Sequence, residues 1–246
     1  MSAVVIIPAR YGSSRFPAKM LAGETGRPLV QHAVDRVRRC ARVREIIVAT
    51  DDRRIVDALR PFGTHAVMTS PAHQSGTDRI AEVAAGLADE LIINVQGDEP
   101  EIDPAAVDGL IDLMTARNSA MATVVTPFGP DKDPSDPNIV KAVVGEDGRA
   151  LYFSRSPVPF RREPTFESVR PYYHHLGIYG YRRDVLLAFA SWRPTVLEQT
   201  EKLEQLRALE NGVRIDCLTV TAAPPGIDTA EQYQAFVRRH QLAQAT

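Results

Sequence analysis

Short apolar runs recur along the first half of the chain, and each meets Gly, Pro or Asp at its C-terminal end. They are VVIIPA (4–9), REIIVATDD (44–52), ELIINVQGDEP (90–100) and MATVVTPF (121–128). Runs of this length that are rich in β-branched residues are typical of strands buried on both faces. The pattern therefore predicts buried strands at these positions.

Amphipathic segments of helical length separate these runs. They span residues 29–43, 53–62, 77–88 and 104–118. Strand and helix alternate, which predicts an α/β fold with a mainly parallel sheet covered on both faces. Ligands of such sheets bind beyond the carboxyl ends of the strands, where we expect the loops 8–19, 50–52 and 96–101.

The pattern changes after residue 128. The stretch from about 129 to 175 is rich in proline and charge, and it predicts extended segments with a mobile loop near 160–170. Helical periodicity returns in RRDVLLAFASW and TEKLEQLRALENG, followed by a strand in RIDCLTVTA and a terminal helix in TAEQYQAFVRRHQLAQ. We interpret the chain (1–246) as a single domain with an inserted subdomain at about 129–200.

Composition narrows the class of protein. The 246 residues are 44% hydrophobic, enough for an extensive core, and 29 Lys+Arg against 31 Asp+Glu give a net charge of -2. No overall field therefore favours nucleic acid or an anionic membrane. Cys40 and Cys217 lack the spacing of a zinc site, and the N-terminal segment resembles neither a signal peptide nor a membrane span. We expect a cytoplasmic protein without membrane insertion.

The loop after the first apolar run carries candidate chemistry. Gly12, Ser13 and Ser14 can offer backbone N–H groups to phosphate, and Arg10, Arg15 and Lys19 add positive charge. The alternative is a solvated basic loop. The spacing matches neither GxxxxGK[ST] nor GxGxxG.

Two acidic positions are candidate metal ligands. Asp98 and Glu99 follow a predicted buried strand in NVQGDEP. Asp228 lies in PPGIDTAEQY, which the fold could bring to the same edge of the sheet. Mg²⁺ is usually held by one or two carboxylates, with phosphate oxygens and water completing its shell. Alternatively, each aspartate caps a helix or turn.

Two further groups of polar residues fit a nucleotide and an acidic sugar. HQSGTDR (73–79) suits hydrogen bonding to a base or ribose, but it equally fits a helix start capped by Ser75, Thr77 or Asp78. The second half offers Arg155, His175, Tyr179, Glu204 and Gln205. Together they suit a polyhydroxylated acid, because guanidinium binds carboxylate and the others match hydroxyl groups. Taken singly, each is more often structural.

The motifs together resemble one family. IIPARYGSSRFPAKML, IVATDD, HQSGTDR, NVQGDEP, ALYFSRSPVP, HLGIYGYR, LEQLR and GIDT occur in the order and at the spacing of the 3-deoxy-manno-octulosonate cytidylyltransferases. The resemblance implies a Rossmann-like, three-layer α/β enzyme, usually a cytoplasmic homodimer. Such an enzyme joins CTP to 3-deoxy-D-manno-octulosonate (Kdo), releasing pyrophosphate and forming CMP-Kdo for lipopolysaccharide synthesis.

The resemblance also implies residue roles. Arg10, Ser13, Arg15 and Lys19 match triphosphate-binding positions; Gln74, Ser75 and Arg79 match the cytidine pocket; Gln96, Arg155, His175, Tyr179, Glu204 and Gln205 match the sugar-acid side; Asp98 and Asp228 match the Mg²⁺ ligands. Lys19, Arg10 and Asp98 are the predicted catalytic residues. The inserted subdomain would carry the substrate and dimer contacts.

Two positions depart from the family motif, and three alternative functions stay open. Phe16 and Ala18 stand where the family commonly has Leu and Gly, which we expect to stiffen the loop and leave phosphate binding intact. A cytidylyltransferase for a sialic acid or for an 8-amino relative of Kdo is the nearest alternative. A glycosyltransferase would normally carry a DxD motif, which DDR (51–53) matches poorly, and a non-catalytic nucleotide-binding protein is the third alternative.

Overall fold

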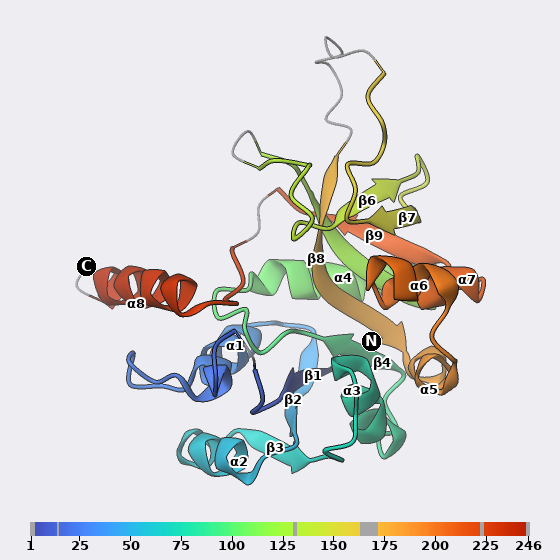
Figure 1. Cartoon of the computed structure of the whole chain (residues 1–246). Coiled ribbons are helices and arrows are strands. Elements are labelled where there is room, and N and C mark those ends of the chain that lie inside the picture. Colours follow the sequence, from blue (N-terminus) through green and yellow to red (C-terminus); the bar gives the residue numbers. More distant parts are fainter. Residues whose placement is uncertain (1–2, 14, 130–131, 163–171, 222–223, 245–246) are drawn as a thin grey trace. The chain divides into compact units, whose positions relative to one another are not determined.

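The computed structural model describes residues 3–13, 15–129, 132–162, 172–221 and 224–244 (Figure 1). The chain forms two compact units. The first unit comprises residues 1–108 and 224–246, and the second comprises residues 109–223. Ser14 and most of the loop predicted near 160–170 lie outside the described residues.

The first unit contains a parallel sheet in the order β3-β2-β1-β4. Its strands are β1 (Ala3–Ala9), β2 (Val43–Thr50), β3 (His65–Met68) and β4 (Leu91–Asn94). Every residue of β1 and β4 is buried, which is what continuous apolar runs require. The predicted buried strands are confirmed here.

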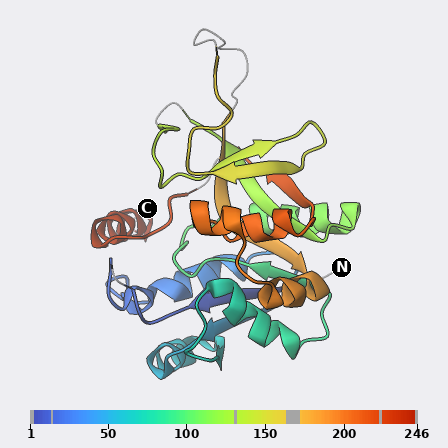
Figure 2. The same ribbon diagram turned by 45° about the vertical axis from the view of Figure 1, so that its right-hand side comes forward.

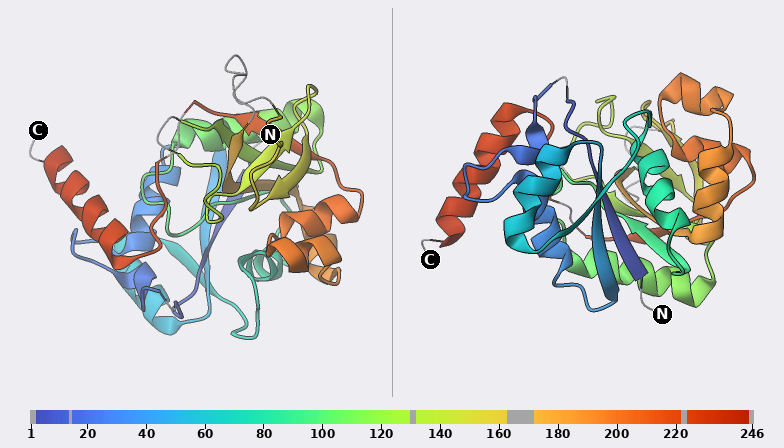
Figure 3. Two further views of the ribbon diagram at one scale, coloured as in Figure 1. Left: turned by 45° about the horizontal axis from the view of Figure 1, so that its top comes forward. Right: turned by 90° about the horizontal axis from the view of Figure 1, so that it is seen from below.

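Helices cover both faces of this sheet. Helices α1 (Leu29–Val37) and α2 (Arg53–Leu59) lie on one face and α3 (Gly76–Ala85) on the other, as the right-hand view of Figure 3 shows. This arrangement follows from the strand order, because the chain reverses its direction of travel between β3 and β4. Helix α8 (Ala230–Gln244) packs Tyr233 and Phe236 against Leu29 of α1. Short 3₁₀ turns occur at Lys19–Leu21 and Arg60–Phe62.

The second unit is built around strand β8 (Tyr173–Arg182). Strand β8 pairs antiparallel with β5 (Met121–Pro127), which pairs parallel with β9 (Ile215–Thr219). The ribbon of β6 (Lys141–Val144) and β7 (Ala150–Ser154) joins β8 through β6 (Figure 2). The other helices are α4 (Pro104–Arg117), which runs from the first unit into the second, α5 (Arg183–Ser191), α6 (Val196–Glu201) and α7 (Gln205–Glu210).

The α/β class with a mainly parallel sheet is confirmed. The subdomain predicted at about 129–200 lies within the second unit, and its boundaries and the single-domain interpretation stay predictions. No helix in the described part of the chain combines the length and apolarity needed to cross a membrane.

One predicted helix is wrong. TEKLEQLRALENG was expected to be continuous, but α6 ends at Glu201 and α7 begins at Gln205. The break occurs because Lys202 adopts the left-handed conformation, with φ of 54°. Strand β3 was missed because it has only four residues, none of them fully buried.

Ala18 also adopts the left-handed conformation, with φ of 55°. It directly precedes the 3₁₀ turn that carries Lys19. A side chain with a Cβ costs about 1–2 kcal/mol in this conformation, and glycine is the residue that avoids the cost. The position where the family commonly has Gly is therefore one that favours glycine.

We expect Ala18→Gly to raise the free energy of unfolding by about 0.5–1 kcal/mol. Relief of the left-handed strain exceeds the roughly 0.4–1 kcal/mol that glycine loses through its freer unfolded chain. Urea unfolding measures the change. Ala22→Gly is the control, because Ala22 has φ of -56° and gains no relief, so this variant should lose stability. Equal destabilisation by both variants would contradict the argument.

Candidate active site

The carboxyl ends of the parallel strands bring several predicted loops to one edge of the first unit. Ala9, the last residue of β1, pairs with Thr50, the last residue of β2. On the other side of β1, Ile6 pairs with Asn94 at the end of β4. The loop 10–19, which is predicted to bind phosphate and is therefore called the phosphate loop, begins at the same edge as the segments 51–52 and 95–101, as expected.

The Lys19 side chain contacts two other segments at this edge. Its ammonium nitrogen lies 2.5 Å from Asp98 Oδ2, 2.8 Å from the Ile227 carbonyl oxygen and 3.3 Å from Asp228 Oδ1. Only 8% of the Lys19 side chain is exposed. The structure thus gathers the basic loop and both predicted metal ligands, which are distant in sequence.

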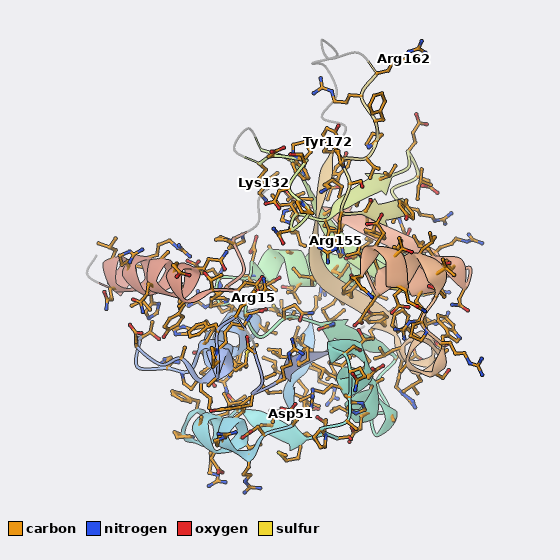
Figure 4. The ribbon with its side chains drawn as sticks, viewed as in Figure 1. Arg15, Asp51, Lys132, Arg155, Arg162 and Tyr172 are labelled. Carbon is orange, nitrogen blue, oxygen red and sulfur yellow. The ribbon has the colours of Figure 1, made fainter. Side chains whose placement is uncertain are left out.

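A second cation reaches the same carboxylates. Arg15 Nη2 lies 3.1 Å from Asp228 Oδ1, and both side chains are largely exposed (Figure 4 labels Arg15). Asp228 N–H and Thr229 N–H both donate to Gln232 Oε1, so the turn before α8 holds Asp228 in place. The Thr229 hydroxyl accepts the Gln232 N–H at 3.3 Å and so takes the capping position at the start of α8, while the Asp228 carboxylate contacts Lys19 and Arg15.

Asp98 and Asp228 have the chemistry of a magnesium site. The Lys19 ammonium nitrogen contacts one carboxylate oxygen of Asp98 and one of Asp228, so both carboxylates lie within reach of a single cation. A pair of carboxylates fits Mg²⁺, which commonly takes one or two and completes its shell with substrate phosphates. Among the described residues there is no group of three or more His, Cys, Asp or Glu side chains placed to hold a metal.

The other predicted residues of the phosphate loop face outward. Arg10 is exposed where β1 ends, and Ser13 is half-buried. Between them, the Tyr11 N–H donates to Asp51 Oδ1 at 3.2 Å. Exposed cations and backbone at the edge of the sheet leave this loop accessible to an anion.

The segment 73–79 mixes exposed and structural groups. Ser75 is the N-cap of α3, since its Oγ accepts the Asp78 N–H at 3.1 Å, so the capping interpretation of Ser75 is confirmed. Gln74 is exposed and donates to the Ala72 carbonyl. Arg79 is buried, and its guanidinium donates to Thr69 Oγ1 and Asp51 Oδ2. A role for Gln74, Ser75 or Arg79 in binding cytidine stays a prediction.

The segment after β4 approaches the end of β1 closely. A Cβ on Gly97 would lie 3.0 Å from Met20 Sδ and 3.3 Å from the Pro8 carbonyl oxygen, so this position favours glycine. Gln96 is half-buried and donates to Asn94 Oδ1 at 3.3 Å. Burial, and then the charge of Asp98, raise the pKa of Glu99 to about 8.

In the second unit, β8 supplies two neighbouring rings, the buried His175 and the half-buried Tyr179. The His175 ring lies 5.2 Å from that of Tyr179 between centroids. Burial, and then His174, lower the pKa of His175 to about 3. The Thr123 hydroxyl donates to the Ile178 carbonyl, so His175 Nε2 at 2.9 Å donates to Thr123 and Nδ1 is left as an acceptor. Burial also raises the pKa of Tyr179 above its ordinary value, with Tyr181 and Glu204 adding to the effect.

The remaining predicted acid-binding residues surround the break between α6 and α7. Arg155, labelled in Figure 4, donates to the carbonyls of Glu201, Pro137 and Lys202 at 2.7, 2.8 and 3.3 Å. Glu204 precedes α7, and Gln205 is 4% exposed. The buried Nε2 of Gln205 has no hydrogen-bond partner in the described part of the chain.

Sequence reasoning missed two residues that hold predicted site residues or their loop in place, one in each unit. Asp51 binds the phosphate loop, and Lys141, fully buried in β6, donates to the carbonyls of Asp136, Ile139 and Arg155. The position of Asp51 at the C-terminal end of a predicted strand run was a usable signal. Lys141 gave none, because a lone lysine in a short strand predicts a solvated side chain.

Comparisons with known proteins agree on one family. Residues 4–215 match the model of the family described as Cytidylyltransferase. The chain is 47% identical over 248 residues to a 3-deoxy-manno-octulosonate cytidylyltransferase of Geobacter metallireducens, covering 97% of this chain and 98% of that one. A protein of the same name from Geotalea daltonii is 49% identical, with the same coverage.

Solved structures extend the comparison to the fold. A CMP:2-keto-3-deoxy-manno-octonic acid synthetase complexed with CTP is 41% identical, has a TM-score of 0.92 and is covered in full, as is this chain. A putative glucose-1-phosphate thymidylyltransferase from Bacillus anthracis shares only the fold, at 15% identity and a TM-score of 0.69, with 97% of this chain and 95% of that one covered. The chain belongs to the 3-deoxy-manno-octulosonate cytidylyltransferase family.

Proposed function

We propose that this chain transfers CMP from CTP to the anomeric 2-hydroxyl of Kdo, releasing pyrophosphate and forming CMP-Kdo for lipopolysaccharide synthesis. The observation that carries the proposal is the contact of Lys19 with both Asp98 and Asp228. It joins the basic loop that suits a triphosphate to a carboxylate pair that suits its metal ion. The names of the similar proteins supply the identity of the nucleotide and the acid.

The first unit would bind CTP. Arg10, Arg15 and Lys19 offset the charge of the triphosphate, and Ser13 adds a hydrogen bond. Gln74 is exposed beside the start of α3 and is available to the cytidine. Holding the triphosphate in one orientation is the main contribution a protein makes to nucleotidyl transfer.

The reaction forms one phosphorus–oxygen bond and breaks another. The 2-hydroxyl oxygen of Kdo attacks the α-phosphorus, pyrophosphate departs on the opposite side, and the hydroxyl proton passes to solvent water. Negative charge increases on the phosphate oxygens during the transfer, so Lys19 contributes most by stabilising that charge. We propose Lys19, Arg10 and Asp98 as the catalytic residues, and no protein base is obligatory because a bound metal ion would lower the pKa of the hydroxyl.

Asp98 and Asp228 would hold Mg²⁺. When bound, the ion supplies positive charge at the phosphate oxygens and lowers the pKa of a nearby hydroxyl. In the free protein the Lys19 ammonium satisfies both carboxylates, which keeps two negative groups together before substrate arrives.

The second unit would bind the sugar acid through fixed hydrogen bonds. His175 is neutral at physiological pH because its pKa is about 3, and Tyr179 keeps its proton. The unpartnered amide of Gln205 is a donor left for a ligand. Arg155 already donates to three carbonyls, so its contribution to the acid would be partial. The role of Gln96 in binding the sugar acid, the homodimeric state and the cytoplasmic location stay predictions.

Pyrophosphate release from CTP with Mg²⁺ tests the function directly. We expect release with Kdo and almost none with N-acetylneuraminic acid or without an acceptor. Release with the sialic acid alone would assign the chain to the neighbouring activity, and CTP binding without release from any acid would make it a binding protein. 8-Amino-Kdo as a third acceptor distinguishes the closest alternative activity.

Asp98→Asn is expected to lower kcat about a hundredfold or more. The amide preserves the shape of the side chain but removes the charge that would hold the metal. Steady-state rates of pyrophosphate release measure the effect, and raising the Mg²⁺ concentration should recover part of it. Asp103→Asn is the control, since the exposed Asp103 carboxylate accepts the Ala105 N–H, a contact that an asparagine oxygen can keep. Near-normal turnover of Asp98→Asn would exclude the role.

Lys19→Met should separate catalysis from binding. If Lys19 stabilises the transition state more than bound CTP, kcat falls while the KM for CTP changes little. A change confined to KM would make Lys19 a binding residue. Mg²⁺ titration without nucleotide gives a second readout, because removing the ammonium leaves Asp98 without a counter-charge. We expect Mg²⁺ to bind Lys19→Met about tenfold more tightly than the wild type, through loss of one favourable charge pair at the carboxylates.

A further inference from the structure

Asp51 connects the phosphate loop to the rest of the first unit. It is the first residue after β2. Its Oδ1 accepts the Tyr11 N–H at 3.2 Å, and its Oδ2 accepts from Arg79 Nη2 at 2.9 Å. One carboxylate therefore bridges the loop and helix α3 (Figure 4 labels Asp51).

The partner of Asp51 is itself fixed. The Arg79 side chain is 4% exposed, and its Nη1 donates to Thr69 Oγ1 at 2.5 Å. The Thr69 hydroxyl donates to the Thr50 carbonyl at 3.0 Å. This chain of hydrogen bonds links helix α3 to the ends of β2 and β3, and it holds the Asp51 carboxylate in one orientation.

A second contact reaches the Tyr11 ring from the same segment. The Arg54 guanidinium carbon lies 3.4 Å from the centroid of the Tyr11 ring. Arg54 is held by a bidentate pair with Asp52, at 2.9 and 2.6 Å, and Asp52 is the N-cap of α2. The backbone and the ring of Tyr11 are therefore both held by residues 51–54.

The location of Tyr11 gives these contacts functional meaning. Tyr11 lies between Arg10 and Ser13, two residues assigned to the triphosphate. A loop that is already ordered loses less conformational entropy when its ligand binds, so affinity rises without a new ligand contact. Arg79 also offsets the charge of Asp51, which would otherwise repel a polyanion in the adjacent loop.

We propose that Asp51 is a positioning residue that fixes the phosphate loop for the triphosphate through Tyr11, with Arg79 neutralising it and Arg54 holding the Tyr11 ring. Asp51 does not touch the nucleotide in this role. The inference rests on the proposed function, because it takes residues 10–19 to be the triphosphate loop. It predicts a selective loss of affinity for CTP relative to CMP.

Calorimetric titration of Asp51→Ala with CTP and with CMP, in Mg²⁺ and without Kdo, tests the inference. We expect the Kd for CTP to rise at least tenfold, the effect of losing a hydrogen bond to a charged group, and the Kd for CMP to change less than twofold. The matched control is Asp89→Ala. Asp89 also pairs with an arginine, and its side chain is 17% exposed against 20% for Asp51. It should bind both nucleotides normally.

Two milder variants keep the test valid if Asp51→Ala folds poorly. Asp51→Asn keeps an oxygen that can accept the Tyr11 N–H, so its loss of CTP affinity should be smaller than that of Asp51→Ala. Arg54→Leu removes a side chain that is 59% exposed and should weaken CTP about threefold while sparing CMP and the melting temperature. In turnover, both should raise the KM for CTP more than they lower kcat.

Three results would overturn the inference. They are unchanged CTP affinity in Asp51→Ala and Arg54→Leu, equal losses for CTP and CMP, and absence of CTP binding by the wild type. Absence of CTP binding by the wild type would also contradict the proposed function. A wild type that binds CTP but releases no pyrophosphate with Kdo would contradict the proposed function alone and leave the CTP-to-CMP comparison decisive for Asp51.

Discussion

The arrangement of the first unit depends on one buried ammonium group. Lys19 has three N–H donors, and Asp98, Ile227 and Asp228 accept all of them. Without this cation, two carboxylates at the same edge would repel each other, and a lysine that is 8% exposed would be costly without acceptors. The interaction therefore brings together the phosphate loop, the turn after β4 and the segment before α8, three parts that local structure alone would leave independent.

The sequence predicted the framework of this site well because its physical basis is local. Continuous apolar runs require strands buried on both faces, and parallel strands place their carboxyl ends at one edge. Asp98 and the loop 10–19 could therefore be assigned to that edge from periodicity alone. Asp228 was less certain, since its position before α8 also fits a cap. The argument from the sheet edge made it a second candidate beside Asp98, and the resemblance to a family then implied its role as the second ligand.

The features that the sequence did not predict depend on long-range contacts. A basic residue in a helix, such as Arg79, ordinarily predicts an exposed charge, yet it is buried because Asp51 and Thr69 come from the ends of neighbouring strands. Lys202 has no local signal for a left-handed turn, since glycine is the residue expected there. Lys141 is buried because the loops around β6 and β7 direct three carbonyls at its ammonium group. Each case needs the fold before the residue can be interpreted.

The two units differ in the charge of their candidate binding residues. The first collects full charges, which suits a triphosphate whose negative charge increases during transfer. The second holds polar groups whose protonation is fixed: His175 stays neutral with a pKa of about 3, and Tyr179 stays protonated. Groups of this kind recognise hydroxyls by geometry, because an unmatched hydroxyl leaves a buried donor or acceptor unpaired. Discrimination between acids of similar charge is therefore expected to come from the second unit, while affinity for the polyanionic nucleotide comes from the first.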